Sequence, residues 1–484
     1  MNIALGLAMA ADGHGDRVAV ADGERSLSYT QLHEVARTVA ARLPDDADTV
    51  VAAGVHGAAL AAGLFGAAWA GRSFAPINHR LPTDRVVELA RRLAPAQGVA
   101  APPYLAPLDR ALPGSWSVDD LFAGVDRPAV TMVEEPAHPA VVLYTSGTAA
   151  EPKAAVIDHG NLFAYLVNTV EFGSAGADEA VLIAVPPFHI AGVAAVLSAV
   201  WVGRRIVALG TFSPASWIEA VQAHSVTHAF VVPTMLARIV EVGAPLPSLR
   251  SLAYGGARMP VPVLERALAL YPHVDFVNAY GLTETSSTIA VLGPDEHRAH
   301  DRLGSVGRPV PGVEVGIVGD GDVPVPPGVT GRVRIRGAQV SGRYLGDDPR
   351  EPGGWLTTGD LGRLDADGYL YIEGRSDDVV IRGGENIAPA EIEDALLRHP
   401  SVAQAAVVGV PHPEWGEQIA AAVVLHGHAS PPAPDDLRTH VRELLGGLKC
   451  PDVVAVVDDL PLTATGKVIG REVRRLLSER VDIG

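Results

Sequence analysis

The chain has 484 residues, of which 48% are hydrophobic and 19% are charged, proportions that are typical of a folded protein with a large core. A chain of this length is expected to form about two to four domains. Its formal net charge of −18 argues against a nucleic-acid partner, because little in it would neutralise a phosphate backbone. The single cysteine, Cys450, excludes an internal disulfide and fits a reducing, cytoplasmic location.

Two apolar segments near the N-terminus raise the question of export or membrane insertion. Residues 1–11 contain an apolar run that no Lys or Arg precedes, so a secretory signal is not expected. Residues 50–71 approach the length of a membrane span, but they are mostly Ala and Gly and include His56. A buried strand followed by an Ala-rich core helix explains this segment better, so we expect no membrane contact.

The first four hundred residues alternate short apolar runs with amphipathic segments, as βαβ units do, and this alternation predicts a large α/β part. In chain order, the pattern predicts a helix over 30–43, a strand over 51–55, a helix over 82–93, strands over 139–145 and 180–186, a helix over 214–223, a strand over 227–233 with a helix after it, and a strand near 274–279.

The residue pattern of the sequence changes near residue 305. Short β-rich runs separated by Gly, Pro and Asp turns predict a small β subdomain. A compact α+β pattern follows, with a helix over 389–398, strands over 402–410 and 418–425, a helix over 434–446 and a strand over 452–457. The boundary is expected at the polar stretch near 375–377, which gives an N-terminal domain over 1–375 and a C-terminal domain over 376–484.

A loop of small and hydroxyl residues follows the predicted strand 139–145. Backbone N–H groups in such a loop can approach an anion closely, and a lysine beside it can contact phosphate oxygens. The loop does not match the GxxxxGK[ST] pattern, and by itself it is more often only a turn. The candidate phosphate-binding residues are Thr145, Ser146, Gly147, Thr148 and Lys153.

Four later segments carry side chains suited to binding a nucleotide. In 280–284, Glu284 beside Thr283 can hold Mg²⁺ against a phosphate, and Tyr280 can stack on a base. In 358–360, Asp360 stands on an expected tight turn and can accept hydrogen bonds from ribose hydroxyls. The remaining two segments add cations, Arg375 in 374–378 and Lys467 in 461–467. Each segment alone can be explained as a helix cap, a turn or a solvated loop. Those explanations do not account for five such segments in one fixed order.

These five segments resemble the motifs of the AMP-forming adenylating enzymes, which include acyl-CoA synthetases, peptide-synthetase adenylation domains and luciferases. The resemblance spans nearly the whole chain. It implies a large N-terminal domain of two α/β subdomains plus a small distorted β-barrel, followed by a mobile α+β C-terminal domain. It also implies that ATP activates an acid as an acyl-adenylate in the presence of Mg²⁺, after which the acyl group passes to a thiol, that of coenzyme A.

The resemblance also implies a role for each matching residue. Lys467 would bridge the carboxylate and the α-phosphate, Thr283 would contact the α-phosphate, Glu284 would bind Mg²⁺, and His189 would flank the carboxylate. The expected nucleotide-binding residues beyond the phosphate loop are Gly255, Gly256, Ala257, Asn278, Tyr280, Gly281, Asp360, Ile372 and Arg375. Asp377 resembles the hinge residue, and the expected coenzyme A contacts are Gly383, Gly384, Trp415 and Lys449.

The phosphate loop departs from the family pattern, because Ala149-Ala150 stands where Thr-Gly is usual and Ala154 replaces a Gly. This departure leaves three interpretations open. The adenylation step could be slower, the protein could be a non-catalytic relative, or it could adenylate an unusual acid or use an amine as the acceptor. The segment 383–393 resembles the acyl-CoA ligase form of the hinge motif, which favours coenzyme A over a carrier protein. No acidic residue is evident for an amino group, so an aryl or medium-length aliphatic acid is expected. Arg258 is expected on the surface rather than against a second carboxylate.

Overall fold

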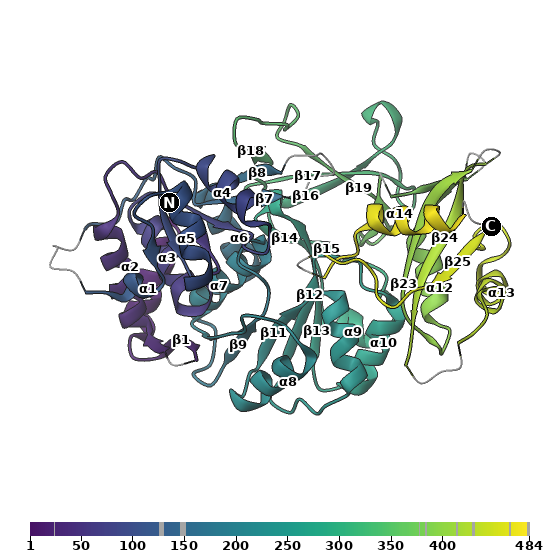
Figure 1. The fold of residues 1–484 in the computed structure, drawn as a ribbon, viewed down its shortest axis with the longest axis horizontal. Helices are drawn as coiled ribbons and strands as arrows, with labels where there is room; N and C mark the ends of the chain where they lie inside the picture. The colour runs from purple at the N-terminus through teal and green to yellow at the C-terminus, as the bar shows by residue number, and fades with distance from the viewer. Residues whose placement is uncertain are drawn as a thin grey trace.

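The computed structural model describes residues 1–23, 25–124, 130–145, 152–376, 378–382, 385–412, 415–427, 431–463 and 466–481. Figure 1 shows the chain running along the long axis of the molecule, from the purple and blue N-terminal elements to the yellow-green C-terminal elements. Three parts follow one another: two large sheets with their helices, a small antiparallel sheet, and a C-terminal α+β part.

The first large sheet has the strand order β18-β8-β7-β4-β3-β5-β6, and its central strands β7, β4, β3 and β5 are parallel. Its strands are β3 (Thr49–Ala53), β4 (Ser73–Ile77), β5 (Ala96–Ala100), β6 (Trp116–Ser117), β7 (Val141–Thr145), β8 (Lys153–Ile157) and β18 (Arg343–Tyr344). Helices α2 (Tyr29–Arg42), α3 (Gly57–Trp69), α4 (Thr83–Arg91) and α5 (Pro102–Ala111) belong to the same part of the chain.

The apolar segment 50–71 forms strand β3 and helix α3, as predicted. Every residue of α3 is buried, because the helix packs against α2 on one side and lies beside β4 on the other. Across the described ranges of the chain, no helix is long and apolar enough to cross a membrane.

The second large sheet has the order β15-β14-β13-β12-β11-β9-β10-β1-β2, and it is parallel from β13 to β1. Its strands are β1 (Val18–Asp22), β2 (Arg25–Ser28), β9 (Ala180–Ile183), β10 (Arg205–Ala208), β11 (His228–Val231), β12 (Ser251–Gly255), β13 (Asp275–Leu282), β14 (Ser287–Leu292) and β15 (Arg308–Pro309). The helices in this part are α1 (Ala4–His14), α6 (His159–Thr169), α7 (Ile190–Val202), α8 (Pro214–Ala223), α9 (Pro233–Val242), α10 (Val261–Leu270) and α11 (Pro294–Ala299). The predicted helix over 214–223 is confirmed as α8.

One hydrophobic core joins the two large sheets. Leu7 of α1, Val39 of α2, Phe65 of α3 and Leu197 of α7 are all buried in it. Because helices that cover both sheets share this core, the two sheets hold a fixed relation to each other. Loops at the carboxyl ends of their parallel strands are therefore presented from a rigid scaffold.

The small β subdomain is a four-stranded antiparallel sheet of β16 (Val313–Val318), β17 (Gly331–Gly337), β19 (Leu356–Leu364) and β20 (Leu370–Arg375). Two local predictions were wrong here and nearby. Thr358 to Asp360 does not form a tight turn but lies within β19, where Gly359 has a φ of +76° and Asp360 pairs with Arg375 of β20. Residues 280–282 do not follow a strand but form the last residues of β13.

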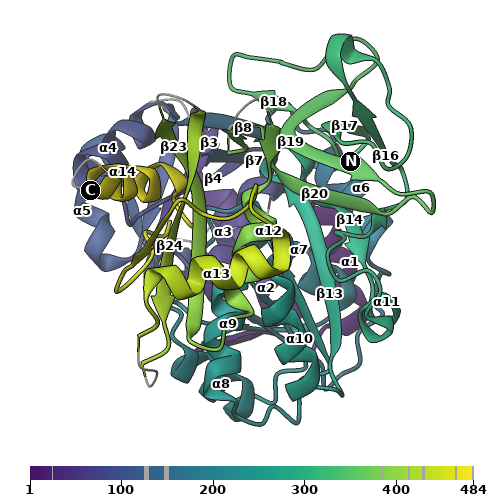
Figure 2. The same cartoon turned by 90° about the vertical axis from the view of Figure 1, so that its right-hand side faces the viewer.

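The C-terminal part is built on β21 (Val380–Arg382), β22 (Glu385–Ile387), β23 (Val402–His412), β24 (Gly416–Leu425) and β25 (Val453–Val456), with helices α12 (Pro389–Leu397), α13 (Pro434–Leu445) and α14 (Gly470–Val481). Figure 2, seen from this end, shows these elements in front of the large sheets and beside the small one. The predicted elements over 389–457 are confirmed, and Cys450 is buried. Helix α14 was not predicted, because half of its residues are charged and its contact with the core rests on Val473 and Leu477, with Leu476 packed beside them.

Candidate active site

The predicted ribose carboxylate lies in a buried cluster that joins three elements. Asp360 of β19 is 4% exposed, and its Oδ2 accepts a hydrogen bond from the hydroxyl of Tyr280 at the end of β13. Arg375, its ladder partner on β20, places Nη1 3.5 Å from Asp360 Oδ1. Burial raises the pKa of Asp360, while the Tyr280 hydroxyl and Arg375 oppose that rise. The arrangement holds a carboxylate ready to accept from donors on a ligand.

Lys467 reaches this cluster from the C-terminal part of the chain. A Cβ added at Gly256 would lie 3.7 Å from Lys467 Cε, so the lysine stem passes directly over the backbone after β12. Although Lys467 remains accessible to solvent, its pKa is lowered by desolvation and then by Arg375, while Asp360 and Glu284 act in the opposite direction. The charges of both predicted carboxylates therefore act on the lysine.

Glu284 is tied to the phosphate-binding candidate Lys153 through a residue that was not predicted. Glu284 lies in the short helix Thr283–Thr285, directly after β13, and its Oε1 accepts from the hydroxyl of Tyr344 at 2.6 Å. Lys153 Nζ lies 4.9 Å from the centroid of the Tyr344 ring and 3.7 Å from Asp347 Oδ2. Nothing local in the sequence indicates Tyr344, because it comes to Glu284 through the pairing of β18 with β8.

His189 precedes helix α7 and lies beside Phe188, with ring centroids 4.9 Å apart. Its pKa is lowered to about 3, first by burial and then by the charges of Lys467 and Arg80. The imidazole is therefore neutral at physiological pH, and it can offer a hydrogen bond without a charge. Phe188 also contacts His79, 5.5 Å between centroids, which extends an unpredicted row of rings toward the first sheet.

The side of the cleft nearest Lys467 is apolar. A Cβ added at Gly255 would lie 3.5 Å from Phe230 Cε2, and one at Gly256 would lie 3.7 Å from Val232 Cγ1. Val232 is buried. A Cβ at Gly255 would also lie 2.2 Å from the carbonyl oxygen of Ala279, so this glycine permits the close approach of β13, whereas the absent side chain of Gly256 lets the Lys467 stem pass beside Val232.

Several remaining candidates take part in ordinary structural contacts. Thr145 Oγ1 donates to the carbonyl of Lys153 at 3.3 Å, and the buried Asn278 contacts the carbonyl of Ser305 at 3.4 Å. Gly281 admits no side chain, because an added Cβ would lie 1.6 Å from the carbonyl oxygen of Ser287. Ala257 follows Gly256 after β12, and Ile372 lies in β20.

Two of the coenzyme A candidates, Trp415 and Lys449, are not brought to this cluster. Trp415 is 46% exposed, and Lys449 pairs with Glu391, so both contact residues of the C-terminal part. The candidates Ser146, Gly147, Thr148, Asp377, Gly383 and Gly384, together with the altered pair Ala149 and Ala150, lie outside the described residues.

Arg258 is exposed, as expected, and it also pairs with a carboxylate of the C-terminal part. Its guanidinium donates to both carboxylate oxygens of Asp394 in α12, with Nη1 3.2 Å from Oδ1. The pair forms because α12 packs beside α10, which brings the C-terminal part against the connection after β12. Arg258 therefore joins the two parts of the chain that form the site.

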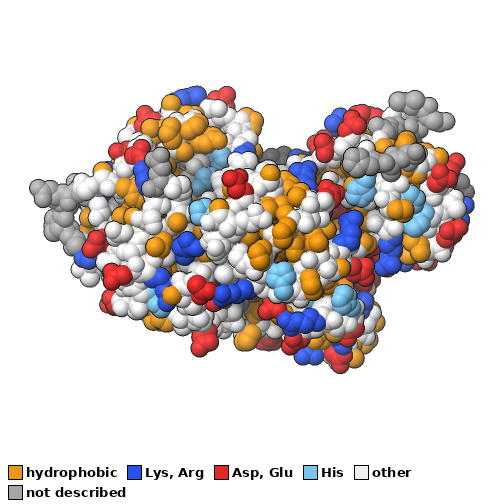
Figure 3. All heavy atoms as spheres, turned by 90° about the horizontal axis from the view of Figure 1, so that it is seen from below, with side chains coloured by type: hydrophobic (Ala, Val, Ile, Leu, Met, Phe, Trp, Pro, Cys, Tyr) orange, Lys and Arg blue, Asp and Glu red, His pale blue; other side chains and the backbone are white. Residues whose placement is uncertain are grey.

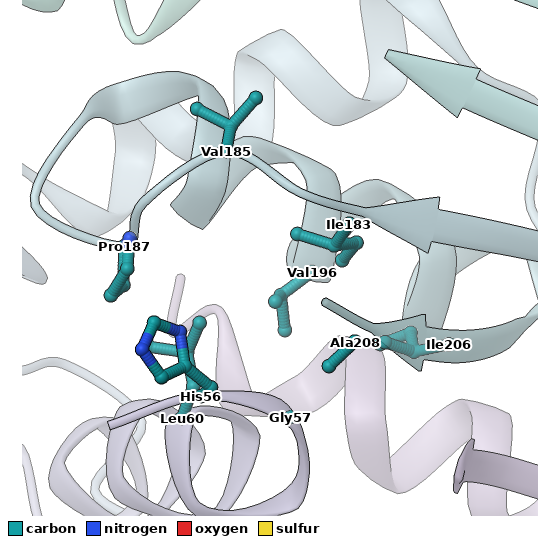
Figure 4. A pocket seen from close by; sticks show the side chains of 9 residues that line it. All are labelled: His56, Gly57, Leu60, Ile183, Val185, Pro187, Val196, Ile206 and Ala208. Carbon is teal, nitrogen blue, oxygen red and sulfur yellow. The ribbon is translucent and has the colours of Figure 1, made fainter. Parts of the chain in front are cut away.

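A separate small pocket lies between α3 and the carboxyl ends of β9 and β10, and Figure 4 shows the His56 ring among its apolar lining residues, which include Ile183, Val185 and Val196. Its volume of about 10 Å³ holds at most about one water molecule, so it is too small for an acid substrate. Figure 3 shows the outer surface from below, where a notch separates the C-terminal part, on the right, and where acidic and basic side chains are interspersed.

The chain is similar to known proteins along nearly its whole length. Residues 7–345 match the AMP-binding enzyme family and residues 391–467 match the AMP-binding enzyme C-terminal domain. A feruloyl-CoA synthase from Amycolatopsis sp. is 34% identical over 94% of this chain and 95% of its own. The o-succinylbenzoate CoA synthetase of Bacillus subtilis, solved with its acyl-adenylate intermediate, is 28% identical with a TM-score of 0.85, covering 97% of each chain. An amide bond synthetase from Marinactinospora thermotolerans is 29% identical with a TM-score of 0.86, covering 98% of this chain and 99% of its own. The chain therefore belongs to the AMP-binding, adenylate-forming enzymes and is an AMP-forming acid–CoA ligase.

Proposed function

We propose that this ligase activates an aromatic monocarboxylic acid. The observation that carries the proposal is the apolar character of Phe230 and Val232, which lie beside Gly255 and Gly256, close to the Lys467 stem. An aromatic ring suits such apolar neighbours, and the lysine beside them would meet a single carboxylate. A second carboxylate would need another cation, and the nearby Arg258 is already paired with Asp394.

In the proposed first step, the ammonium of Lys467 lies between the acid carboxylate and the α-phosphate of ATP. The negative charge that develops when the carboxylate attacks is offset by this fixed cation. Thr283 adds a hydroxyl donor at the α-phosphate. His189 would flank the carboxylate as a neutral group, since its pKa of about 3 keeps it uncharged.

The nucleotide would be held by the buried cluster around Asp360. Its carboxylate would accept hydrogen bonds from the ribose hydroxyls, with Arg375 beside it. The ring of Tyr280 and the backbone over 255–257 would form the adenine wall, together with Asn278, Gly281 and Ile372.

Glu284 is the residue that would bind Mg²⁺. Across the described ranges of the chain, no group of three or more His, Cys, Asp or Glu side chains converges to hold a metal. One carboxylate nevertheless fits this ion, because Mg²⁺ is usually bound by one or two carboxylates plus phosphate oxygens of the substrate. When bound, the ion would supply positive charge to the departing pyrophosphate, with Lys153 and the loop over 145–148 on the same phosphates.

We further propose that residues 376–484 move as one domain relative to residues 1–375, with Asp377 as the hinge. Support comes from the sheets: β20 of the small antiparallel sheet ends at Arg375, and β21 of the C-terminal sheet begins at Val380. The movement would withdraw Lys467 and admit coenzyme A, with Gly383, Gly384, Trp415 and Lys449 as its contacts. The supply of ATP and the single cysteine favour a cytoplasmic location.

The test is an ATP–pyrophosphate exchange screen with ferulate, indole-3-acetate, 2-succinylbenzoate, octanoate and phenylalanine. Ferulate and indole-3-acetate should support exchange best, whereas preference for phenylalanine, 2-succinylbenzoate or octanoate would overturn the substrate proposal. The acceptor is then tested by supplying coenzyme A, carrier proteins or amines to the preformed acyl-adenylate. Lys467→Ala should abolish exchange but largely spare thioester formation from supplied acyl-adenylate, and equal loss of both would refute the role of Lys467.

A further inference from the structure

We propose that Thr234 is a positioning residue that holds the Lys467 loop in place for adenylation, an inference that rests on the proposed role of Lys467. Thr234 is the second residue of α9, directly after the strand β11 that lines the acid side of the cleft. Its Oγ1 donates to the carbonyl of Gly466 at 2.9 Å, a hydrogen bond that spans 232 residues. The residue that accepts this bond immediately precedes the lysine.

The contact requires a glycine on the other side. Gly466 has a φ of +79°, and a Cβ added there would lie 2.5 Å from Thr234 Oγ1 and 3.4 Å from Val232 Cγ2. Only a residue without a side chain can therefore bring its carbonyl to the start of α9 in this conformation. The glycine and the threonine hydroxyl form a matched pair across the two parts of the chain.

The loop that carries the lysine is closed on itself. The N–H of Thr463 donates to the carbonyl of Lys467 at 2.7 Å, and the N–H of Lys467 donates to Thr463 Oγ1 at 3.0 Å. The N–H of Gly466 donates to the carbonyl of Thr463 at 2.9 Å. Because these bonds hold the turn together, fixing the Gly466 carbonyl also fixes the direction in which Lys467 leaves the loop.

A single hydrogen bond suits a contact that is made and broken in every catalytic cycle. Its net contribution corresponds to about a two- to tenfold change in an equilibrium, which is enough to favour the adenylation position without locking it. Loss of the hydroxyl should therefore slow the step that needs Lys467 in the cleft, and it should leave the thioester step unchanged.

The experiment compares Thr234→Val, which keeps the shape and removes the donor, with Thr234→Ser, which keeps the donor. Pyrophosphate exchange should fall about three- to tenfold in Thr234→Val and recover in Thr234→Ser, while thioester formation from supplied acyl-adenylate stays at the wild-type rate in both. Thr227→Val is the matched control, because the Thr227 hydroxyl donates to Ala180 within the second sheet, 3.0 Å away, and does not reach the C-terminal part.

The proposal is overturned if Thr234→Val slows both half-reactions equally, if Thr234→Ser is as slow as Thr234→Val, or if Thr227→Val reproduces the split between the two half-reactions. Lys467→Ala, assayed in parallel, separates this failure from failure of the proposed function. If Lys467→Ala retains pyrophosphate exchange, the proposed role of the lysine is wrong. If Lys467→Ala loses exchange while Thr234→Val exchanges at the wild-type rate, only the positioning role of Thr234 is rejected.

Discussion

Acidification from pH 7 to pH 5 should destabilise the N-terminal part of the enzyme through one buried histidine, His159. The side chain is 5% exposed, and its Nδ1 accepts a hydrogen bond from the backbone N–H of Ile3 at 3.2 Å. Burial, and then the charge of the chain's amino terminus, lower the pKa of His159 from 6.5 to about 4. The imidazole must therefore be neutral for the N-terminal segment to pack as it does.

The sign of the effect follows from proton uptake. Between pH 6.5 and pH 4 the unfolded chain binds a proton at His159 and the folded chain does not, so the stability that is present above pH 6.5 is lost as the pH falls. The difference between the two pKa values corresponds to roughly 3 kcal/mol below pH 4. About 2 kcal/mol of this is lost between pH 7 and pH 5.

The assay is urea-induced unfolding at pH 7 and pH 5 for the wild type and for His159→Gln, whose amide oxygen can still accept from Ile3 but does not titrate. Between pH 7 and pH 5, the free energy of unfolding of the wild type should fall by about 2 kcal/mol more than that of the variant. His224→Gln, at an exposed position, should behave like the wild type. Equal losses in the wild type and His159→Gln would refute the reasoning.

Three further substitutions test contacts around the site. Tyr344→Phe removes the donor to the proposed Mg²⁺ carboxylate and should raise the Mg²⁺ concentration needed for half-maximal pyrophosphate exchange about tenfold. Tyr369→Phe loses a similar hydrogen bond, to Glu296, and should leave the Mg²⁺ requirement unchanged. Equal Mg²⁺ curves for the two variants would contradict the role of Tyr344. Arg258→Ala breaks the partly exposed pair with Asp394, which should slow exchange a few-fold and spare thioester formation; unchanged exchange would show that the pair does not steady the adenylation state. Gly281→Ala forces a Cβ against the backbone of β14 and should reduce both half-reactions and lower the melting temperature, so a wild-type melting curve would contradict the close approach.

The sequence indicated the site well where the chemistry is local. Glu284 follows a strand end and Lys467 stands in a turn, while Asp360 lies within β19 beside Gly359, and the charges of both carboxylates act on Lys467. The helix over 214–223 and the strand–helix pair within 50–71 were predictable for a similar reason, because their periodicity and cap residues lie within one segment.

Contacts between distant segments could not be predicted in this way. Tyr344 reaches Glu284 across 60 residues, and Thr234 reaches Gly466 across 232. Arg258 gives no local sign that its partner is a carboxylate 136 residues later. Such pairings depend on sheet order and on how the C-terminal part packs against α10, and neither leaves a periodic trace in the sequence.

The division of the cleft among different strands bears on how such an enzyme can diversify. The proposed nucleotide contacts Tyr280 and Asp360 lie on β13 and β19, whereas Phe230 and Val232 lie on β11 and the connection that follows it. A substitution at Phe230 or Val232 would therefore leave Tyr280 and Asp360 in place, although both residues adjoin the backbone of Gly255 and Gly256 in the proposed adenine wall. A change at Phe230 should thus be read out against both substrates, because its ring lies 3.5 Å from the Cβ position of Gly255 and can affect ATP as well as the acid.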